Sequence, residues 1–505
     1  MYTRRLRPTA KMASLMDRFL DQVSIRGVVA RLGLKRLGVG ALLIAMSLPP
    51  LIVRVHPVQF MQEFSLEMAL RYLPLAVLFC LSVLAGAAFI WRYERKTWGS
   101  IRDLLIVSTL IIGMLWTTRA VMWLHPDTPL YLLPIPLGAL LATWLLSSNL
   151  GLLVAVVTSL NATLMGVSTD VGAVGVLIWA ITGAVAASMI SERRATLSVG
   201  ALLVLSGAIV AFAATLGLQQ PLSAALDSAR WGAVGGFLSA ILGYGLLPFF
   251  ENVFRVTTDV RLLELTSSSH PLLRRLMQEA PGTYSHSIIT GNLAEAGAEA
   301  TGARALLARA GAYYHDVGKL RRPGFFAENQ GGEGNPHDSR LPSLSALIIT
   351  AHVREGVELA REHSLPQEVI DIIRQHHGTS LVSYFYSKAA EGNTPVYEAD
   401  FRYDGDAPHS REAALVMLAD CAEASVRALR KPTAIRVENA VRRVIENKVA
   451  DGQLTNSTLT LADIESVIQV YTKVLKAINH SRVEYYEPLT VRSEYADKSR
   501  ESSRA

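Results

Sequence analysis

The sequence predicts an all-α protein, in which a polytopic transmembrane helical bundle precedes a cytosolic, all-helical domain. The composition changes near Glu251, because residues 39–250 are dominated by Leu, Ala, Val, Ile and Gly, whereas charges recur every few residues afterwards. Residues 128–191 contain Asp170 as their only charged side chain, and residues 195–226 contain none. Soluble helices need a charged or polar face, so these stretches indicate a membrane. Residues 281–475 show helical spacing of apolar side chains without the alternation of strands.

The membrane part begins after a basic cytoplasmic segment, residues 1–38, and extends over residues 39–250. A helix needs about 20 apolar residues to cross a bilayer. The first candidate span is short and is interrupted by Pro49-Pro50. We therefore expect seven or eight spans, and the candidates are residues 39–55, 69–91, 104–124, 128–146, 150–167, 171–190, 198–218 and 231–250.

Loop charges predict how these spans are oriented. The loops around residues 125–127 and 168–170 contain no Lys or Arg, whereas the loops after the second and sixth spans are basic. The basic residues in those two loops are Arg92, Arg95, Lys96, Arg102, Arg193 and Arg194. Because positive loops stay on the cytoplasmic side, we expect a multi-pass protein of a bacterial inner membrane with the second domain in the cytoplasm. Arg54, Arg71 and Arg119 are exceptions to the pattern.

Residues 251–280 are predicted to be a helical linker, with a break at residues 267–269 and a new helix starting at Pro271. Such a linker either transmits movement from the membrane part or packs on the second domain. The two cysteines, Cys80 and Cys421, lie in different parts of the chain, which predicts no disulfide and fits a reducing compartment. The tail, residues 488–505, is polar and is predicted to be disordered.

The second domain, residues 281–487, contains an ordered series of metal-binding residue types. Helical periodicity is expected over residues 288–300, 306–314, 343–363, 368–376, 412–429 and 434–449. Five short stretches on or beside these helices supply the candidate ligands. They are His286, His315, Asp316, His352, His376, His377 and Asp420. Facing helices of a bundle can bring such residues together around metal ions.

The types of these ligands indicate their chemistry. Imidazole and carboxylate groups without cysteine suit first-row transition metals, so we expect two Mn or Fe ions. Asp316 can bridge both ions, while His286, His315 and Asp420 complete one site. His352, His376 and His377 would bind the second ion. Two adjacent metals can activate water against a phosphodiester, which predicts a hydrolase.

His315, Asp316 and Lys319 are the predicted catalytic residues. Lys319 follows the His-Asp pair by three residues and lies near the metals if the helix ends at Gly318. It is then either a phosphate contact or a solvated lysine at a helix C-terminus, where cations are favoured. The loop formed by residues 321–342 is long enough to cover the site.

Several motifs around the ligands resemble a known family. They are Pro-Gly-Thr-Tyr-Ser-His-Ser at residues 281–287, Ala-Tyr-Tyr-His-Asp-Val-Gly-Lys at 312–319, Asn-Pro-His-Asp at 335–338 and Ile-Arg-Gln-His-His-Gly-Thr at 373–379. These residues are similar to the cytoplasmic domain of PgpH-type, seven-transmembrane HD-domain phosphodiesterases. The resemblance extends over residues 254–475 and implies hydrolysis of cyclic di-AMP to pApA with two transition metals. It implies the seven ligands named above, all of which are present.

One departure from the family is large. Its members usually have a big extracellular domain after the first span, whereas residues 56–68 alone separate the first two spans here. We therefore expect that the usual extracytoplasmic sensor is missing. The expected partners are a cyclic dinucleotide and the lipid bilayer, with a homodimer as a further candidate and no nucleic acid.

Three other functions remain open from the sequence. The same metal chemistry would serve an HD hydrolase of cyclic di-GMP or of a nucleoside phosphate. The extended signature of cyclic di-GMP enzymes is absent, because Leu320 and Arg321 follow Lys319. A nucleotide-binding membrane receptor without turnover would lack one or more of the metal ligands, whereas all seven candidate ligands are present here. A transporter would need ionisable or helix-breaking groups at mid-membrane, where the spans offer mainly Asn161 and Pro134 with Pro136.

Overall fold

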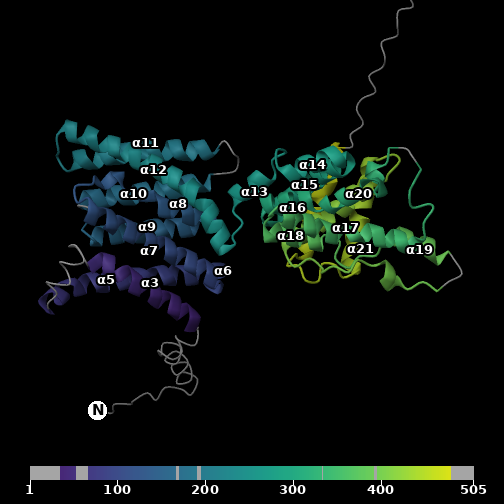
Figure 1. Ribbon diagram of the computed structural model, residues 1–505, viewed down its shortest axis with the longest axis horizontal. Helices are drawn as coiled ribbons and strands as arrows, with labels where there is room; N and C mark the ends of the chain where they lie inside the picture. Colours follow the sequence, from purple (N-terminus) through teal and green to yellow (C-terminus); the bar gives the residue numbers. More distant parts are fainter. Residues whose placement is uncertain are drawn as a thin grey trace, which may run out of the picture. The chain divides into compact units, whose positions relative to one another are not determined.

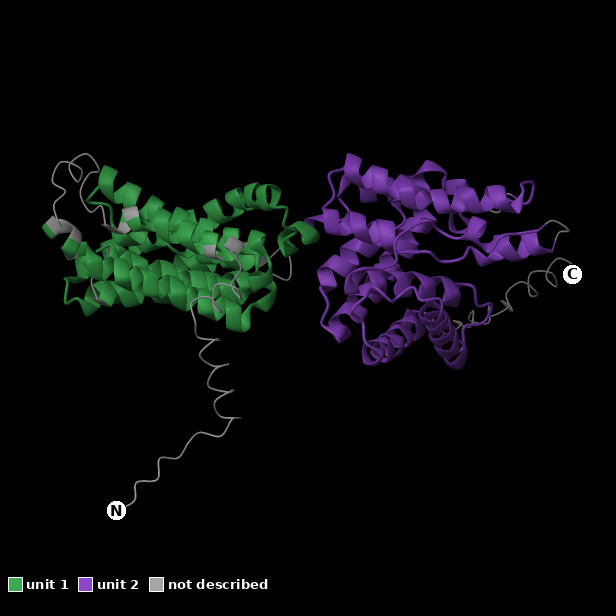
Figure 2. Cartoon of the chain, turned by 90° about the horizontal axis from the view of Figure 1, so that it is seen from below, with its two compact units in different colours: residues 1–263 green, residues 264–505 purple. Residues whose placement is uncertain are grey.

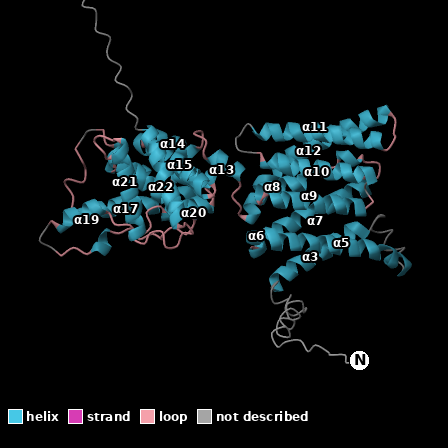
Figure 3. Cartoon of the chain, turned by 180° about the vertical axis from the view of Figure 1, so that it is seen from behind, coloured by secondary structure: helices cyan, strands magenta, loops and turns pink. Residues whose placement is uncertain are grey.

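The computed structural model describes residues 34–52, 66–166, 170–189, 195–331, 334–391 and 395–478. The chain forms two compact units, Met1–Leu263 and Glu264–Ala505 (Figure 2). Within the described ranges the regular structure is helical (Figure 3), and the one β-type pairing is an isolated bridge between Leu381 and Arg402. The predicted all-α fold class is therefore confirmed. The predicted disordered tail and most of the basic N-terminal segment lie outside the described residues.

Unit 1 is a bundle of apolar helices. Figure 1 shows α11 and α12 along one side of this unit and α3 and α5 along the other, with α7 to α10 between them. The helices are α3 (Leu34–Ile52), α5 (Leu66–Tyr93), α6 (Arg95–Gly99), α7 (Ile101–Leu124), η1 (Leu130–Leu132), α8 (Pro136–Leu145), α9 (Ser148–Leu164), α10 (Asp170–Ser188), α11 (Ala195–Gly217) and α12 (Leu222–Phe254).

The apolar helices of unit 1 correspond to the predicted spans. Five of the described helices are long and apolar enough to cross a membrane, namely those containing Tyr72–Tyr93, Ile101–Leu124, Val171–Ser188, Leu197–Gly217 and Leu222–Phe254. Three shorter apolar helices contain Gly38–Leu48, Leu130–Leu145 and Ser148–Leu164. The unit is thus built as a multi-pass membrane bundle, while the choice between seven and eight spans stays a prediction.

The predicted interruption of the first span at Pro49-Pro50 is wrong, because α3 continues to Ile52. Pro50 has no N–H to donate to the carbonyl of Met46. Trp116 of α7 donates its indole N–H to that carbonyl instead, at 2.7 Å. Arg119, one turn further along α7, donates to the carbonyl of Pro50 at 2.6 Å and to that of Met165 at 3.0 Å. Arg119 is therefore a buried structural residue, which explains why it departs from the loop-charge pattern.

Two other spans differ from their predicted limits. The fourth is divided into η1 and α8 around Pro134, since Pro134 and Pro136 cannot donate backbone hydrogen bonds. The last helix begins at Leu222 rather than at residue 231. Its first turns accommodate charge because Arg230 and Asp227 form an exposed ion pair with each other.

Helices α11 and α12 approach each other so closely that glycines form their interface. A Cβ atom on Gly236 would collide with the backbone carbonyl of Leu203, and one on Gly207 would collide with the carbonyl of Gly232. Small residues allow this kind of close backbone approach between membrane helices.

Replacing Gly236 by alanine is expected to destabilise unit 1 by about 1–3 kcal/mol, the usual cost of overpacking a close interface. Gly245→Ala is the matched control, because a Cβ atom at Gly245 of the same helix meets no heavy atom within 4 Å. Thermal unfolding of the full chain in detergent measures the difference. An equal melting temperature for both variants would contradict the close approach.

Unit 2 and the segment that leads into it consist of α-helices of 7 to 21 residues and short 3-10 turns. They are α13 (Asp259–Leu265), α14 (Pro271–Glu279), α15 (Pro281–Thr301), α16 (Ala305–Tyr314), η2 (Val317–Arg321), η3 (Pro323–Phe325), η4 (Ala327–Asn329), α17 (Pro342–Glu362), α18 (Gln367–Gln375), α19 (Ser383–Ala390), η5 (Glu398–Phe401), α20 (Arg411–Arg427), α21 (Ala434–Ala450) and α22 (Leu461–Ile478). Each of the six predicted helices is present. The predicted new start at Pro271 is confirmed, with Pro271 as the first residue of α14.

Candidate metal centre

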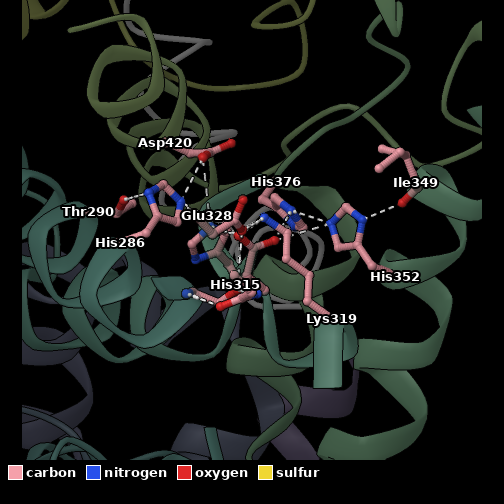
Figure 4. Close-up of polar contacts among 12 residues, drawn as sticks. His286, Thr290, His315, Lys319, Glu328, Ile349, His352, His376 and Asp420 are labelled. Atoms are coloured by element: carbon pink, nitrogen blue, oxygen red, sulfur yellow. Dashed lines mark hydrogen bonds and ion pairs between the residues drawn. The ribbon is translucent and has the colours of Figure 1, made fainter. Parts of the chain in front are cut away.

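The seven predicted ligands converge in the interior of unit 2. His286 lies on α15, His315 ends α16 and Asp316 follows it directly. His352 lies on α17, His376 and His377 follow the last turn of α18, and Asp420 lies on α20. Figure 4 labels five of them, and their side chains point toward one another, with His286 and His352 at opposite ends of the cluster.

Asp316 occupies the middle of this cluster. Its Oδ2 lies 3.2 Å from His315 Nε2 and 3.6 Å from His286 Nε2. Its Oδ1 lies 3.3 Å from His352 Nε2 and 3.8 Å from His376 Nε2. The two oxygens of one carboxylate therefore face two separate histidine pairs.

Each histidine pair has a further candidate ligand. Asp420 Oδ1 lies 3.1 Å from His286 Nε2 and 3.8 Å from His315 Nε2. His377 stands beside the second pair, with its ring centroid 4.1 Å from that of His376 and 5.2 Å from that of His352. The ligand atoms of two groups, His286–His315–Asp316 and Asp316–His352–His376–His377, each lie within 4.8 Å of one another.

The chemistry of these atoms fits bound cations. His352 donates its Nδ1–H to the carbonyl of Ile349 at 2.6 Å, and His376 does the same to Ile373 at 2.7 Å. This leaves lone pairs on the two Nε2 atoms, which face each other at 3.3 Å. Asp316 Oδ1 is also buried, and it has no hydrogen-bond partner among the described residues. A metal ion bound by all three atoms removes this repulsion and satisfies the buried oxygen.

The charge states of His376 and Asp316 suit ligand roles, whereas His315 would lose a proton on binding a metal: burial lowers its pKa, but Asp316 and Asp420 outweigh burial and raise that pKa to about 10. Burial, reinforced by the charges of His315 and His352, lowers the pKa of His376 to about 3, so its ring is neutral. Burial by itself raises the pKa of Asp316, but the charges of His315 and Lys319 outweigh it and hold that pKa well below its usual value. Neutral imidazole and ionised carboxylate are the forms that bind metals.

Gly318 allows the segment after Asp316 to lie against α17. A Cβ atom on Gly318 would collide with the carbonyl oxygen of His352 and with the backbone nitrogen of Gly356. Only glycine permits this approach, which sets the separation between Asp316 and His352. The His-Asp-x-Gly spacing is therefore a packing requirement as well as a ligand pattern.

Lys319 does not take the second of its two predicted roles, that of a solvated lysine, while its role as a phosphate contact stays a prediction. Its side chain is only 13% exposed, so it is not a solvated lysine. Its Nζ lies 2.7 Å from Asp316 Oδ2 and 2.7 Å from Glu328 Oε1. Glu328 also accepts a hydrogen bond from Thr283, which joins the loop of residues 321–342 to α15. Lys319 thus links Asp316 to the loop of residues 321–342.

Besides Glu328, two further site residues were missed by the sequence analysis. Tyr403 stacks on His377, with ring centroids 4.3 Å apart and planes 28° apart, and no motif marks it. Glu423 places Oε2 2.6 Å from His286 Nδ1 and is buried. Glu423 lies three residues after Asp420 on α20, so helical periodicity offered a signal for it. A carboxylate on the second ring nitrogen fixes the orientation of a ligand histidine.

Replacing Glu423 by alanine is expected to weaken metal binding by about 10- to 100-fold, the usual effect of losing such a partner. Arg427→Gln is the control, because Arg427 approaches Glu423 at 3.6 Å from an exposed position and does not hold His286. Metal titration of the full chain by calorimetry measures the change. Equal affinities of the Glu423 variant and the wild type would rule out this role.

Family comparisons agree with the division into two units. Residues 69–258 match the family described as 7TM receptor with intracellular HD hydrolase, and residues 283–425 match the HD domain family. The first region contains α5 and α7 to α12, which are seven apolar helices within the described residues.

Curated relatives and solved structures are similar to large parts of the chain. The cyclic-di-AMP phosphodiesterase PgpH of Bacillus subtilis is 38% identical over 391 residues, covering 76% of this chain and 55% of the relative. PgpH of Listeria monocytogenes is 43% identical over 252 residues, covering 50% of this chain and 35% of the relative. The chain thus spans about half or less of the length of these relatives.

Crystal structures of the L. monocytogenes PgpH HD domain, alone and in complex with cyclic di-AMP, are 42% and 43% identical to this chain. Both have a TM-score of 0.41, and the alignments cover 42% and 43% of this chain and 100% of those chains.

Proposed function

Since the chain belongs to the family of seven-transmembrane receptors with an intracellular HD hydrolase, we propose that it is a membrane-anchored, metal-dependent phosphodiesterase that hydrolyses cyclic di-AMP to pApA. The names of the two PgpH relatives support this substrate. The observation that carries the proposed reaction is the position of Asp316, whose two buried oxygens each face a pair of histidines.

The ligand set supports two metal ions. His286, His315 and Asp420 would hold one ion, His352, His376 and His377 would hold the other, and Asp316 would contribute to both. Nitrogen and oxygen donors without a thiolate favour Mn or Fe. Two such ions supply an activated water and neutralise charge on a phosphoryl group.

The chain's own residues prepare the site for this chemistry. Glu423 orients His286, and backbone carbonyls orient His352 and His376. Lys319 places a positive charge beside Asp316, where a phosphate would otherwise meet uncompensated carboxylates. Tyr403 offers an aromatic face beside His377. His315, Asp316 and Lys319 are therefore the residues that we assign to catalysis.

The distribution of basic residues among the loops supports the proposed location of the protein in the membrane. The basic loops and the absence of a disulfide favour a bacterial inner membrane with unit 2 in the cytoplasm. Cyclic di-AMP and the lipid bilayer are then the partners. A homodimer remains a further prediction.

The test is to incubate the full chain, purified in detergent, with Mn²⁺ and separately with cyclic di-AMP, cyclic di-GMP and a nucleoside triphosphate. Selective conversion of cyclic di-AMP, with pApA identified by mass spectrometry, is expected. Faster conversion of cyclic di-GMP would show that cyclic di-AMP is not the preferred substrate, but it would still identify the chain as a phosphodiesterase. Metal-loaded protein that binds cyclic di-AMP without converting it would make the chain a receptor instead.

A further inference from the structure

Unit 1 contains an apolar cavity of about 340 Å³ between α3, α5, α7 and α9. Its walls are formed mainly by aliphatic side chains of these helices, such as Leu43, Ile90, Val107 and Leu153. An apolar cavity of about 150 Å³ is already large enough for a benzene-sized molecule. Cavities of about 300 Å³ and more are typical of small-molecule sites.

The interior of this cavity offers little to a polar ligand. Its lining contains two hydroxyl side chains, Ser108 and Ser82, and the Ser82 hydroxyl donates to the carbonyl of Phe79 at 2.8 Å and lies 3.3 Å from Asn161 Nδ2. This hydroxyl is therefore already used within the protein. An occupant deep in the cavity must be a hydrocarbon, because a polar group there would lose its hydrogen bonds to water.

The cavity opens toward the outer surface of the helices. Leu84 and Ala41 belong to its wall, yet both are exposed, Leu84 by 60%. They lie on α5 and α3, whose neighbouring apolar residues are exposed in the same way. In a membrane this surface faces lipid, so acyl chains reach the opening directly.

One end of the cavity carries a positive charge. Arg36 and Trp98 both line it, and the Arg36 guanidinium lies over the Trp98 ring at 5.7 Å from its centroid. Among the residues that the structure describes, Arg36 forms no ion pair with a carboxylate. Arg36 lies in the first turn of α3, and Trp98 lies in α6 just after α5. Basic and aromatic side chains at the ends of membrane helices meet lipid headgroups.

We propose that this cavity binds one acyl chain of an anionic membrane lipid, with the headgroup paired to Arg36. The hydrocarbon part of such a lipid matches the aliphatic walls. Its anionic headgroup matches the guanidinium of Arg36, which has no carboxylate partner among the described residues. The proposal does not depend on the reaction catalysed by unit 2.

Glycine and alanine positions allow the cavity to be filled without disturbing the protein. A Cβ atom at Gly40, which lines the cavity, meets no heavy atom within 4 Å, and the same holds for Gly38, which lies outside the lining. Gly40→Leu therefore fills the cavity, while Gly38→Leu is its matched control on α3. On α5, Ala87→Phe fills the cavity and the exposed neighbour Ala88 provides the control Ala88→Phe.

The experiment exchanges the full chain into nanodiscs containing equal amounts of phosphatidylglycerol and phosphatidylcholine with identical acyl chains. Native mass spectrometry then counts the lipids that stay bound after release from the disc. The wild type is expected to retain one phosphatidylglycerol per chain, with about a fivefold preference over phosphatidylcholine, the size expected for one basic side chain near an anionic surface.

Gly40→Leu and Ala87→Phe are expected to lower this retention at least about tenfold, since displacing even two buried methylenes removes that much affinity. Arg36→Gln should abolish the headgroup preference, while Gly38→Leu and Ala88→Phe should behave as the wild type. Only variants with the elution volume and melting temperature of the wild type are compared. If Gly40→Leu does not fold, the comparison of Ala87→Phe with Ala88→Phe on α5 decides the outcome. Unchanged retention in the filled variants, unchanged preference in Arg36→Gln, or no retained lipid in the wild type would overturn the proposal.

Discussion

Replacing Asp316 by asparagine is expected to remove both metal ions and to lower phosphodiesterase activity by about 10³-fold or more. The two oxygens of Asp316 face different histidine pairs, so one substitution affects both halves of the centre. An amide keeps the shape of the side chain but offers only one neutral acceptor oxygen. Its NH₂ group would occupy the place of the second oxygen and would face the ring nitrogens of one histidine pair. A change at Asp316 should therefore act on two ions at once.

Elemental analysis of the purified full chain tests this directly, because it counts metal ions per chain without a substrate. The wild type is expected to hold two transition-metal ions and Asp316→Asn close to none. His376→Ala should retain one, since it removes a ligand from one half only. Asp371→Asn is the control, because Asp371 pairs with Arg374 on the exposed side of α18. Two retained ions in Asp316→Asn would show that Asp316 does not bridge the centre.

The convergence of the seven candidate ligands could be predicted from the sequence, because metal chemistry restricts residue types and because His315 and Asp316 are adjacent in the chain. Glu423 was within reach of the same reasoning, since it shares a face of α20 with Asp420. Glu328 and Tyr403 were not, because Glu328 lies in the single 3-10 turn η4 and Tyr403 in a loop, and the paths of both segments follow from tertiary packing rather than from periodicity. Their contribution becomes visible only when Lys319 and His377 are seen to contact them.

In the membrane part, too, contacts between distant segments could not be predicted from the sequence. Apolar runs indicated a helix at each predicted span, because hydropathy and length determine that choice. The persistence of α3 through Pro49-Pro50 depends on Trp116, a residue of another helix that satisfies the carbonyl left free by Pro50. Local rules for proline predict the broken hydrogen bond correctly, but they cannot identify the donor that replaces it.

Replacing Lys319 by methionine is expected to destabilise unit 2 and to lower activity together. In the metal-free protein this substitution leaves Glu328, whose side chain is 11% exposed, beside the buried Asp316 without the cation between them. Breaking a buried ion pair by removing one partner costs about 3–5 kcal/mol. For a unit of this size that corresponds to a fall of about 6–20 °C in the melting temperature, measured in the presence of a chelator.

The double variant Lys319→Met/Glu328→Gln separates the structural role of Lys319 from its catalytic role. Removing the Glu328 charge relieves much of the repulsion, so the melting temperature should recover by about half or more, as expected for residues that interact directly. Activity should not recover, because no positive charge then faces the phosphate beside Asp316. If activity returns with stability, Lys319 only fastens the loop to the site. If Lys319→Met melts like the wild type, the ion pairs with Asp316 and Glu328 contribute nothing to folding, and the role of Lys319 lies with the substrate alone.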